Sequence, residues 1–198
     1  FGRVDPKALE AAIRPDTILV IIMYANNETG TIQPVAEIGE ICKQHGVLYH
    51  CDAVQAVGHV DIDLSALNID YLSLAAHKFG GPKGVGALVL SDDAPVYSLV
   101  LGGGQENGLR SGTEPLPQIA ACGAAAEIGA KEAGAAQERM GQLRQHCIER
   151  VLAGDRTRKV LYLQNWGGLD HDVAVTLPAE CRDWKVTPLH GTFAGKDG

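Results

Sequence analysis

The sequence is poor in aromatic residues, in basic charge and in long apolar runs. Phe, Trp and Tyr make up only 5% of the 198 residues, and the formal net charge is −7. Proteins that bind nucleic acid normally carry a basic face, and this composition shows none. The longest apolar run, from Ile18 to Tyr24, is far too short to cross a bilayer, and no signal peptide is visible. We therefore expect neither nucleic acid nor a membrane as a partner.

Paired cysteines and clustered metal ligands are also missing. The five cysteines contain no C-x-x-C pair, and Cys51 beside His50 does not have the spacing of a zinc site. Reduced thiols in the cytoplasm and no bound metal are the expected state. The chain opens at Phe1 on a helix-like segment, which suggests a piece of a longer protein.

Glycine and apolar residues are plentiful, at 24 residues and 45% of the chain, as in a close-packed α/β protein. Helices are predicted to open at Asp5–Pro6 and at Pro34, the second ending at Gly46. The run 17–24 is typical of a strand buried on both faces. The other predicted elements are strands over 47–51, 71–75 and 84–90 and a brief helix over 64–67. Their order predicts a mostly parallel sheet flanked by helices.

A long helical pattern follows over 117–153, although its glycines weaken the prediction that it is unbroken. Ile119, Cys122, Ala126 and Ile128 are expected to face inward. After Gly154 the texture changes, with possible strands over 159–163 and 173–177. We therefore divide the chain into an α/β domain over 1–115, a connecting helix over 116–153 and a divergent tail over 154–198.

Polar residues follow the predicted strands at the points where the strands end. Asn27, Asp52 and Lys78 each occupy such a place. Open α/β sheets bind ligands at the carboxyl ends of their strands. We therefore expect these three residues to converge on one edge of the sheet.

Lys78 and Asp52 each allow a chemical and a structural interpretation. Lys78 lies between an apolar strand and a Gly-rich turn. A lysine on such a semi-buried turn can act as an amine nucleophile, but an ordinary surface lysine fits the pattern too. Asp52 offers a carboxylate to a cationic ring nitrogen of a cofactor, or it caps the residues that follow.

Two loops offer donors to a ligand. The amides of Asn26–Gly30 suit a cofactor oxygen, and the segments 102–106 and Arg110–Thr113 combine backbone N–H groups, a hydroxyl and a guanidinium, which suit a phosphate. A plain turn and a plain glycine loop are the alternatives.

Four motifs in order carry a resemblance to a known family. NNETG, DAVQAVGH, HKFGGPKGVGAL and GGGQE…RSGTE together resemble the cysteine desulfurases and selenocysteine lyases, in the class V aminotransferase group of pyridoxal-phosphate (PLP) enzymes of fold type I. The resemblance covers roughly Pro6 to Ala153. It implies conversion of L-cysteine to L-alanine with an enzyme-bound persulfide, and sulfur donation to an acceptor protein for iron–sulfur cluster or thio-cofactor assembly.

The resemblance also implies roles for single residues. Lys78 would hold PLP covalently and act as the base that moves the substrate's α-proton. Asp52 would pair with the pyridine nitrogen of PLP. Gln55 and Asn27 would lie near the ring's phenolic oxygen and the substrate. His77 would help to bind the phosphate.

The last motif implies a dimer. In this family its Thr, here Thr113, reaches the phosphate of the cofactor in the partner subunit, so a homodimer with shared sites is expected. Many members carry a Ser, as a phosphate ligand, where this chain has Ala75.

Other parts of the family pattern are not found. The ring-stacking His, the loop with the persulfide-forming Cys and the substrate-binding Arg are missing, Cys181 has the wrong context, and the tail from about Arg156 does not resemble the family. Three readings follow: a cysteine desulfurase, a selenocysteine lyase or other class V aminotransferase, and an inactive fragment that only folds, dimerises or binds cofactor weakly.

Overall fold

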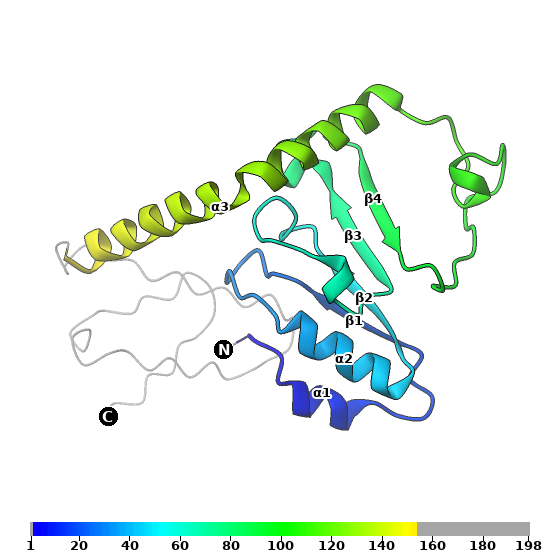
Figure 1. The fold of residues 1–198 in the computed structure, drawn as a ribbon, viewed down its shortest axis with the longest axis horizontal. Helices are drawn as coiled ribbons and strands as arrows, with labels where there is room; N and C mark the ends of the chain where they lie inside the picture. Colours follow the sequence, from blue (N-terminus) through cyan, green and yellow to red (C-terminus); the bar gives the residue numbers. More distant parts are fainter. Residues whose placement is uncertain (1, 154–198) are drawn as a thin grey trace, which may run out of the picture. The chain divides into compact units, whose positions relative to one another are not determined.

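A computed structural model describes residues 2–153 of the chain (Figure 1). The strands predicted over 159–163 and 173–177, and Cys181, lie outside this range. The chain divides into two compact units, Phe1–Gln142 and Leu143–Gly198. The elements are helices α1 (Pro6–Ala12), α2 (Val35–His45) and α3 (Leu116–Ala153), strands β1 (Leu19–Met23), β2 (Leu48–Asp52), β3 (Tyr71–Ala75) and β4 (Gly86–Leu90), and the 3₁₀ turns η1 (Leu64–Ala66), η2 (Ala76–Lys78) and η3 (Glu106–Gly108).

The four strands form one sheet in the order β1-β2-β3-β4. β1, β2 and β3 run parallel, and β4 runs antiparallel to β3. The register pairs Met23 with Asp52, and Asp52 with Ser73. This arrangement confirms the mostly parallel sheet that the sequence predicts.

The ends of the first two helices follow from local chemistry. Asp5 caps α1, because its Oδ1 accepts a hydrogen bond from the Lys7 N–H at 3.0 Å, and Pro6 occupies the first turn. α2 ends at Gly46, whose φ of +66° is the left-handed conformation that glycine adopts without a steric penalty. Both predicted helix ends are confirmed.

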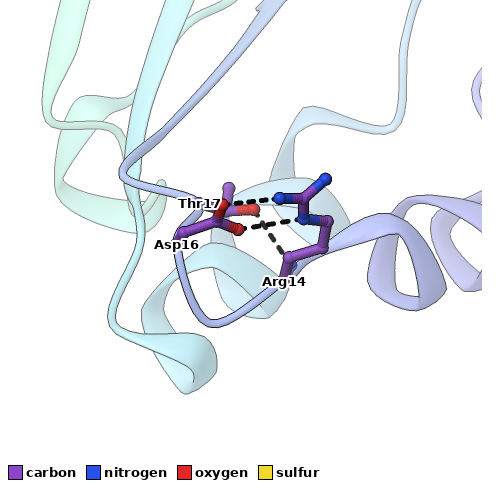
Figure 2. Close-up of polar contacts among 3 residues, drawn as sticks. All are labelled: Arg14, Asp16 and Thr17. Carbon is purple, nitrogen blue, oxygen red and sulfur yellow. Dashed lines mark hydrogen bonds and ion pairs between the residues drawn. The ribbon is translucent and has the colours of Figure 1, made fainter.

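The turn between α1 and β1 is held by a local polar cluster (Figure 2). The Arg14 Nε donates to Asp16 Oδ1 at 2.9 Å, and the Arg14 N–H donates to Thr17 Oγ1 at 2.9 Å. The Arg14 and Asp16 side chains are largely exposed. Such an exposed ion pair fixes the path of the chain into β1 more than it stabilises the fold.

The core lies between α2 and one face of the sheet. Ile38 of α2 and Tyr49 and Cys51 of β2 are completely buried. α2 approaches the segment after η1 closely, since a Cβ on Gly39 would lie 2.6 Å from the Asn68 carbonyl oxygen. A glycine at this position lets the helix backbone reach that contact.

The prediction that 17–24 is buried on both faces is wrong. Val20 is buried, but Ile18 and Ile21 are 80% and 62% exposed. Ile21 is in register with His50 and Tyr71, on the face of the sheet opposite to α2. β1 is an edge strand of this sheet, and its apolar residues on that face are not covered by any described element.

Helix α3 is continuous over 38 residues, but the prediction of its inward face is only partly right. Ile119, Ala126 and Ile128 are exposed, whereas Cys122 is half-buried. The other half-buried positions before Met140 are Ala125, Gly129, Ala133 and Ala136. Small residues are used because the backbones approach closely: a Cβ on Gly129 would lie 3.4 Å from the Cα of Gly58. None of the helices within 2–153 combines the length and the apolar character needed to span a membrane.

Two glycine-to-alanine substitutions test this packing. Gly39→Ala places a Cβ against the Asn68 carbonyl, so we expect a loss of about 1–2 kcal/mol in the free energy of unfolding, despite the better helix propensity of alanine. Gly123→Ala is the matched control on α3, because nothing lies within 4 Å of its Cβ. It is expected to gain about 0.5–1 kcal/mol. Urea unfolding followed by circular dichroism measures both, and equal gains would contradict the packing of α2.

Candidate functional site

Three parallel strands bring their carboxyl ends to one edge of the sheet. The Tyr24 N–H donates to the Asp52 carbonyl at 2.8 Å, and the Ala53 N–H donates to the Ser73 carbonyl at 2.9 Å. The loops that follow β1, β2 and β3 therefore leave from adjacent points on the same edge. Ligands bind at such edges in open α/β sheets.

Asp52 is the last residue of β2 and is half-buried. Its Oδ1 accepts a hydrogen bond from the Val54 N–H at 3.0 Å, so the structural interpretation, a carboxylate that caps the following turn, holds for this oxygen. The other carboxylate oxygen has no hydrogen bond to any residue within 2–153. One carboxylate oxygen of Asp52 therefore stabilises the turn, while the other is available to a ligand.

The turn after Asp52 keeps Gln55 at the surface of the site. Ala53 and Ala56 are completely buried, and the Ala56 N–H donates to the Ala53 carbonyl at 2.9 Å. The alanines fill the packed positions of the turn, so Gln55 is half-buried. Asp52 and Gln55 thus belong to one short, firmly held segment.

Lys78 lies in η2, directly after β3. Ala76 is completely buried, and its N–H donates to the Val85 carbonyl at 3.1 Å. The Gly81 N–H closes the turn on the Ala76 carbonyl at 2.9 Å, and a Cβ on Gly81 would lie 2.8 Å from that of Ala76. Glycine at position 81 is therefore a steric requirement of the lysine turn.

The lysine turn is half-buried, but the Lys78 side chain itself is not. His77 and Lys78 are both exposed. The inward positions of this short turn are taken by Ala76 and by the half-buried Phe79, so the two residues between them project to solvent. The Lys78 amine forms no ion pair with any residue of the described range.

Asn27 lies in a loop whose turn is made by its neighbour. The Asn26 Oδ1 accepts hydrogen bonds from the Glu28 and Thr29 N–H groups, each at 2.9 Å. Asn27 itself is exposed, and its Nδ2 donates to the Glu28 Oε1 at 3.1 Å. The turn interpretation therefore accounts for Asn26, and the Asn27 side chain is held only by an exposed contact.

The loop that contains Thr113 starts from the opposite end of the sheet, where the parallel strands begin. β4 is antiparallel to β3, so its last residue, Leu90, pairs with Tyr71 at the start of β3. The loop is braced internally: Ser111 is only 6% exposed, its Oγ accepts from the Gly104 N–H at 3.3 Å, and the Gly112 N–H donates to Gln105 Oε1 at 2.9 Å. Thr113 is exposed. No hydrogen bond among the described residues joins it to Asp52 or Lys78.

A hollow of about 510 Å³ lies beside the lysine turn. Its walls are the segments 58–59 and 78–80 and the small residues of α3. Lys78 lines it, but Asn27, Asp52, Gln55 and Thr113 do not. The edge of the sheet, rather than this hollow, collects the predicted site residues.

One contact to Lys78 was missed in the sequence. The Nε2 of His59 lies 2.9 Å from the carbonyl oxygen of Lys78. His59 closes the motif DAVQAVGH, so the motif contains the residue, but sequence spacing alone does not show that it reaches the lysine turn.

Two of the four described cysteines are unsuited to act as nucleophiles. Burial raises the pKa of the Cys42 and Cys51 thiols to about 11, so both are protonated at neutral pH. Cys122 and Cys147 lie on α3, half-buried and exposed respectively, and all four thiols are free. Within residues 2–153 no three His, Cys, Asp or Glu side chains are grouped as metal ligands.

The chain matches known proteins over most of its length. The family model of class V aminotransferases matches residues 1–165, so the likeness reaches a few residues beyond Arg156. Cysteine desulfurase IscS of Methanosarcina thermophila is 48% identical over 157 residues, which cover 79% of this chain and 39% of that protein.

Solved structures agree with this match. A NifS-like protein has a TM-score of 0.74 at 44% identity, covering 76% of this chain and 42% of the other. A structure of SspA in complex with cysteine has a TM-score of 0.62 at 46% identity, covering 64% and 37%. This chain therefore spans about two fifths of the length of the relatives it matches.

The residues at the sheet edge fit the cofactor of this family, PLP. PLP enzymes need a lysine amine that holds the cofactor and an acidic partner for the pyridine nitrogen. The exposed Lys78 amine and the Asp52 oxygen without a hydrogen bond in the described range are groups of these two kinds, on neighbouring strand ends. The family match over 1–165 and the agreement with solved structures show that the chain belongs to the class V aminotransferases, a family of PLP-dependent enzymes.

Proposed function

We propose that the protein to which this chain belongs is a cysteine desulfurase. In this reaction the C–S bond of L-cysteine breaks, the sulfur passes to an enzyme thiolate as a persulfide, and the carbon skeleton takes up a proton and leaves as L-alanine. The observation that carries the proposal is the placement of Asp52 and the Lys78 turn on one sheet edge in a chain 48% identical to a cysteine desulfurase.

In this proposal Lys78 and Asp52 do the central work. Bound PLP supplies an electron sink for the electron pair left at the substrate's α-carbon. The Lys78 amine would hold the cofactor covalently and, once released, would act as the general base for the α-proton. The Asp52 carboxylate keeps the pyridine nitrogen protonated, and its placement at the end of β2 fixes the distance to the lysine turn.

Three further residues are proposed to hold the cofactor and the substrate. Gln55, on the firmly held turn after Asp52, and Asn27 would bind near the phenolic oxygen of the ring and the substrate. His77, adjacent to Lys78 and exposed, donates to the phosphate. All three follow carboxyl ends of the parallel strands, which supports their assignment to one site.

We propose a homodimer in which Thr113 serves the partner subunit's cofactor. Two observations support this. The loop of Thr113 leaves the sheet at the edge opposite to Asp52, and it presents the apolar side chains of Tyr97, Leu99 and Leu101, which are 87%, 95% and 83% exposed. An apolar loop of this size suits a protein interface.

The thiol that receives the sulfur is proposed to lie outside residues 2–153. The buried Cys42 and Cys51 are protonated and inaccessible, which makes them unsuitable as thiolate nucleophiles. From that thiol the sulfur would pass to an acceptor protein for iron–sulfur cluster or thio-cofactor assembly. We place the protein in the cytoplasm, where free thiols such as Cys147 persist.

Substitution of the lysine tests the cofactor site. With added PLP, the chain is expected to develop an absorbance band at the violet edge of the visible spectrum, and Lys78→Ala is expected to abolish it. Lys83→Ala is the matched control, because Lys83 is an exposed lysine in the turn that follows, five residues further along the chain. A band that survives in Lys78→Ala and disappears in Lys83→Ala would refute the assignment, and no band in any of the three would show that this chain is an inactive fragment.

Substitution of the aspartate tests the pairing with the ring nitrogen. Asp52→Asn keeps an acceptor for the Val54 N–H but removes the charge, so the turn should persist while PLP binds about 10–100-fold more weakly. Titration of the same absorbance band gives the dissociation constants. Asp63→Asn, which alters the cap of η1, serves as the control and should leave the constant unchanged. Equal constants for Asp52→Asn and the wild type would remove Asp52 from the site.

A further inference from the structure

We infer that His59 is a positioning residue that fixes the main chain of Lys78, an inference that rests on the proposed role of the lysine. The His59 Nε2 lies 2.9 Å from the Lys78 carbonyl oxygen. A carbonyl oxygen only accepts hydrogen bonds, so Nε2 carries the proton and donates. The bond joins the segment that follows β2 to the segment that follows β3, across 19 positions of sequence.

His59 is itself held from the side of α3. The Gln137 Nε2 donates to the His59 carbonyl at 2.7 Å. Gly58, directly before it, has a φ of +78°, and a Cβ there would lie 2.5 Å from the Cβ of Phe79. The backbone at 58–59 therefore packs against the lysine turn and is hydrogen-bonded to α3. This fixes the backbone of His59, so its ring is held where it contacts Lys78.

The lysine needs such an anchor because little else fixes it. Its side chain is exposed, and η2 is a single turn of three residues. The carbonyl of Lys78 and the N–H of Phe79 belong to one rigid peptide unit. That unit is held at one end by the Phe79 N–H bond to the Ala76 carbonyl, at 3.1 Å, and at the other by His59. Loss of the hydrogen bond from His59 frees this peptide unit to rotate. The Lys78 Cα, from which the side chain extends, then moves as well.

The same bond links the two halves of the proposed site. Asp52 and Gln55 belong to the segment that ends at His59, and Lys78 belongs to the turn that receives the bond. A cofactor held by an amine and a carboxylate requires a fixed separation between them, and small misplacements of reacting groups are costly. His59 therefore sets the position of the amine relative to Asp52 without touching the cofactor.

The test uses His59→Ala, His59→Gln and His45→Ala. Gln retains an N–H donor on a side chain of similar reach, and His45 is the matched control, since its ring pairs with Glu10 and has no contact with the lysine turn. The first readout needs no PLP: amide hydrogen exchange of the peptide that contains Phe79 and Gly81. The second is the rate at which the PLP absorbance band forms.

We expect His59→Ala to speed exchange at Phe79 by about 5–10-fold, the effect of one lost hydrogen bond, and to slow band formation by a similar factor. His59→Gln should restore both values to within about twofold of the wild type, and His45→Ala should change neither. Wild-type exchange in His59→Ala would overturn the inference. Failure of His59→Gln to restore either value would also overturn it, because the ring would then act by packing alone. A wild-type chain that forms no band shows that this chain is an inactive fragment, while the exchange result still decides whether His59 holds Lys78.

Discussion

The parallel pairing of β1, β2 and β3 is the constraint on which the site depends. Hydrogen bonds across the strands fix Met23, Asp52 and Ser73 in one row, and the polar loops can only begin beyond that row. The separation between the Asp52 carboxylate and the Lys78 turn is therefore set by the spacing of neighbouring strands. Burial of Tyr49, Cys51 and Ile38 keeps β2 in register. Core packing on one face of the sheet therefore maintains the position of Asp52 at the end of β2.

Backbone contacts, rather than side-chain contacts, define the lysine turn. Ala76 is buried and bonded on both sides, and Gly81 is required because a Cβ would meet that of Ala76. His59 adds a third restraint from the adjacent loop. The amine at the end of this turn stays exposed, which suits a group that must meet a cofactor from solution.

The strands and helix ends could be predicted from the sequence because short-range signals determine them. Asp5–Pro6, Gly46 and the strand over 71–75 are such cases. The exposure of Ile21 and Ile128 could not be predicted, since it depends on which neighbours cover a residue. An apolar run is the same whether one face or both are covered. The His59–Lys78 bond was likewise hidden, because it depends on how two loops pack. Of the proposed site, the strand-end positions of Asp52 and Lys78 followed from the sequence pattern. That the loop of Thr113 leaves the sheet at the opposite end could not be predicted, because it depends on the antiparallel pairing of β4.

The most direct test of the account is to find where PLP attaches to this chain. Borohydride reduction of the chain with stoichiometric PLP, followed by peptide mass spectrometry, locates the modified lysine. We expect one pyridoxyl group, on Lys78. Modification spread over exposed lysines such as Lys43, Lys83 and Lys131, or concentrated on one of them, would contradict the claim that this edge of the sheet forms the cofactor site.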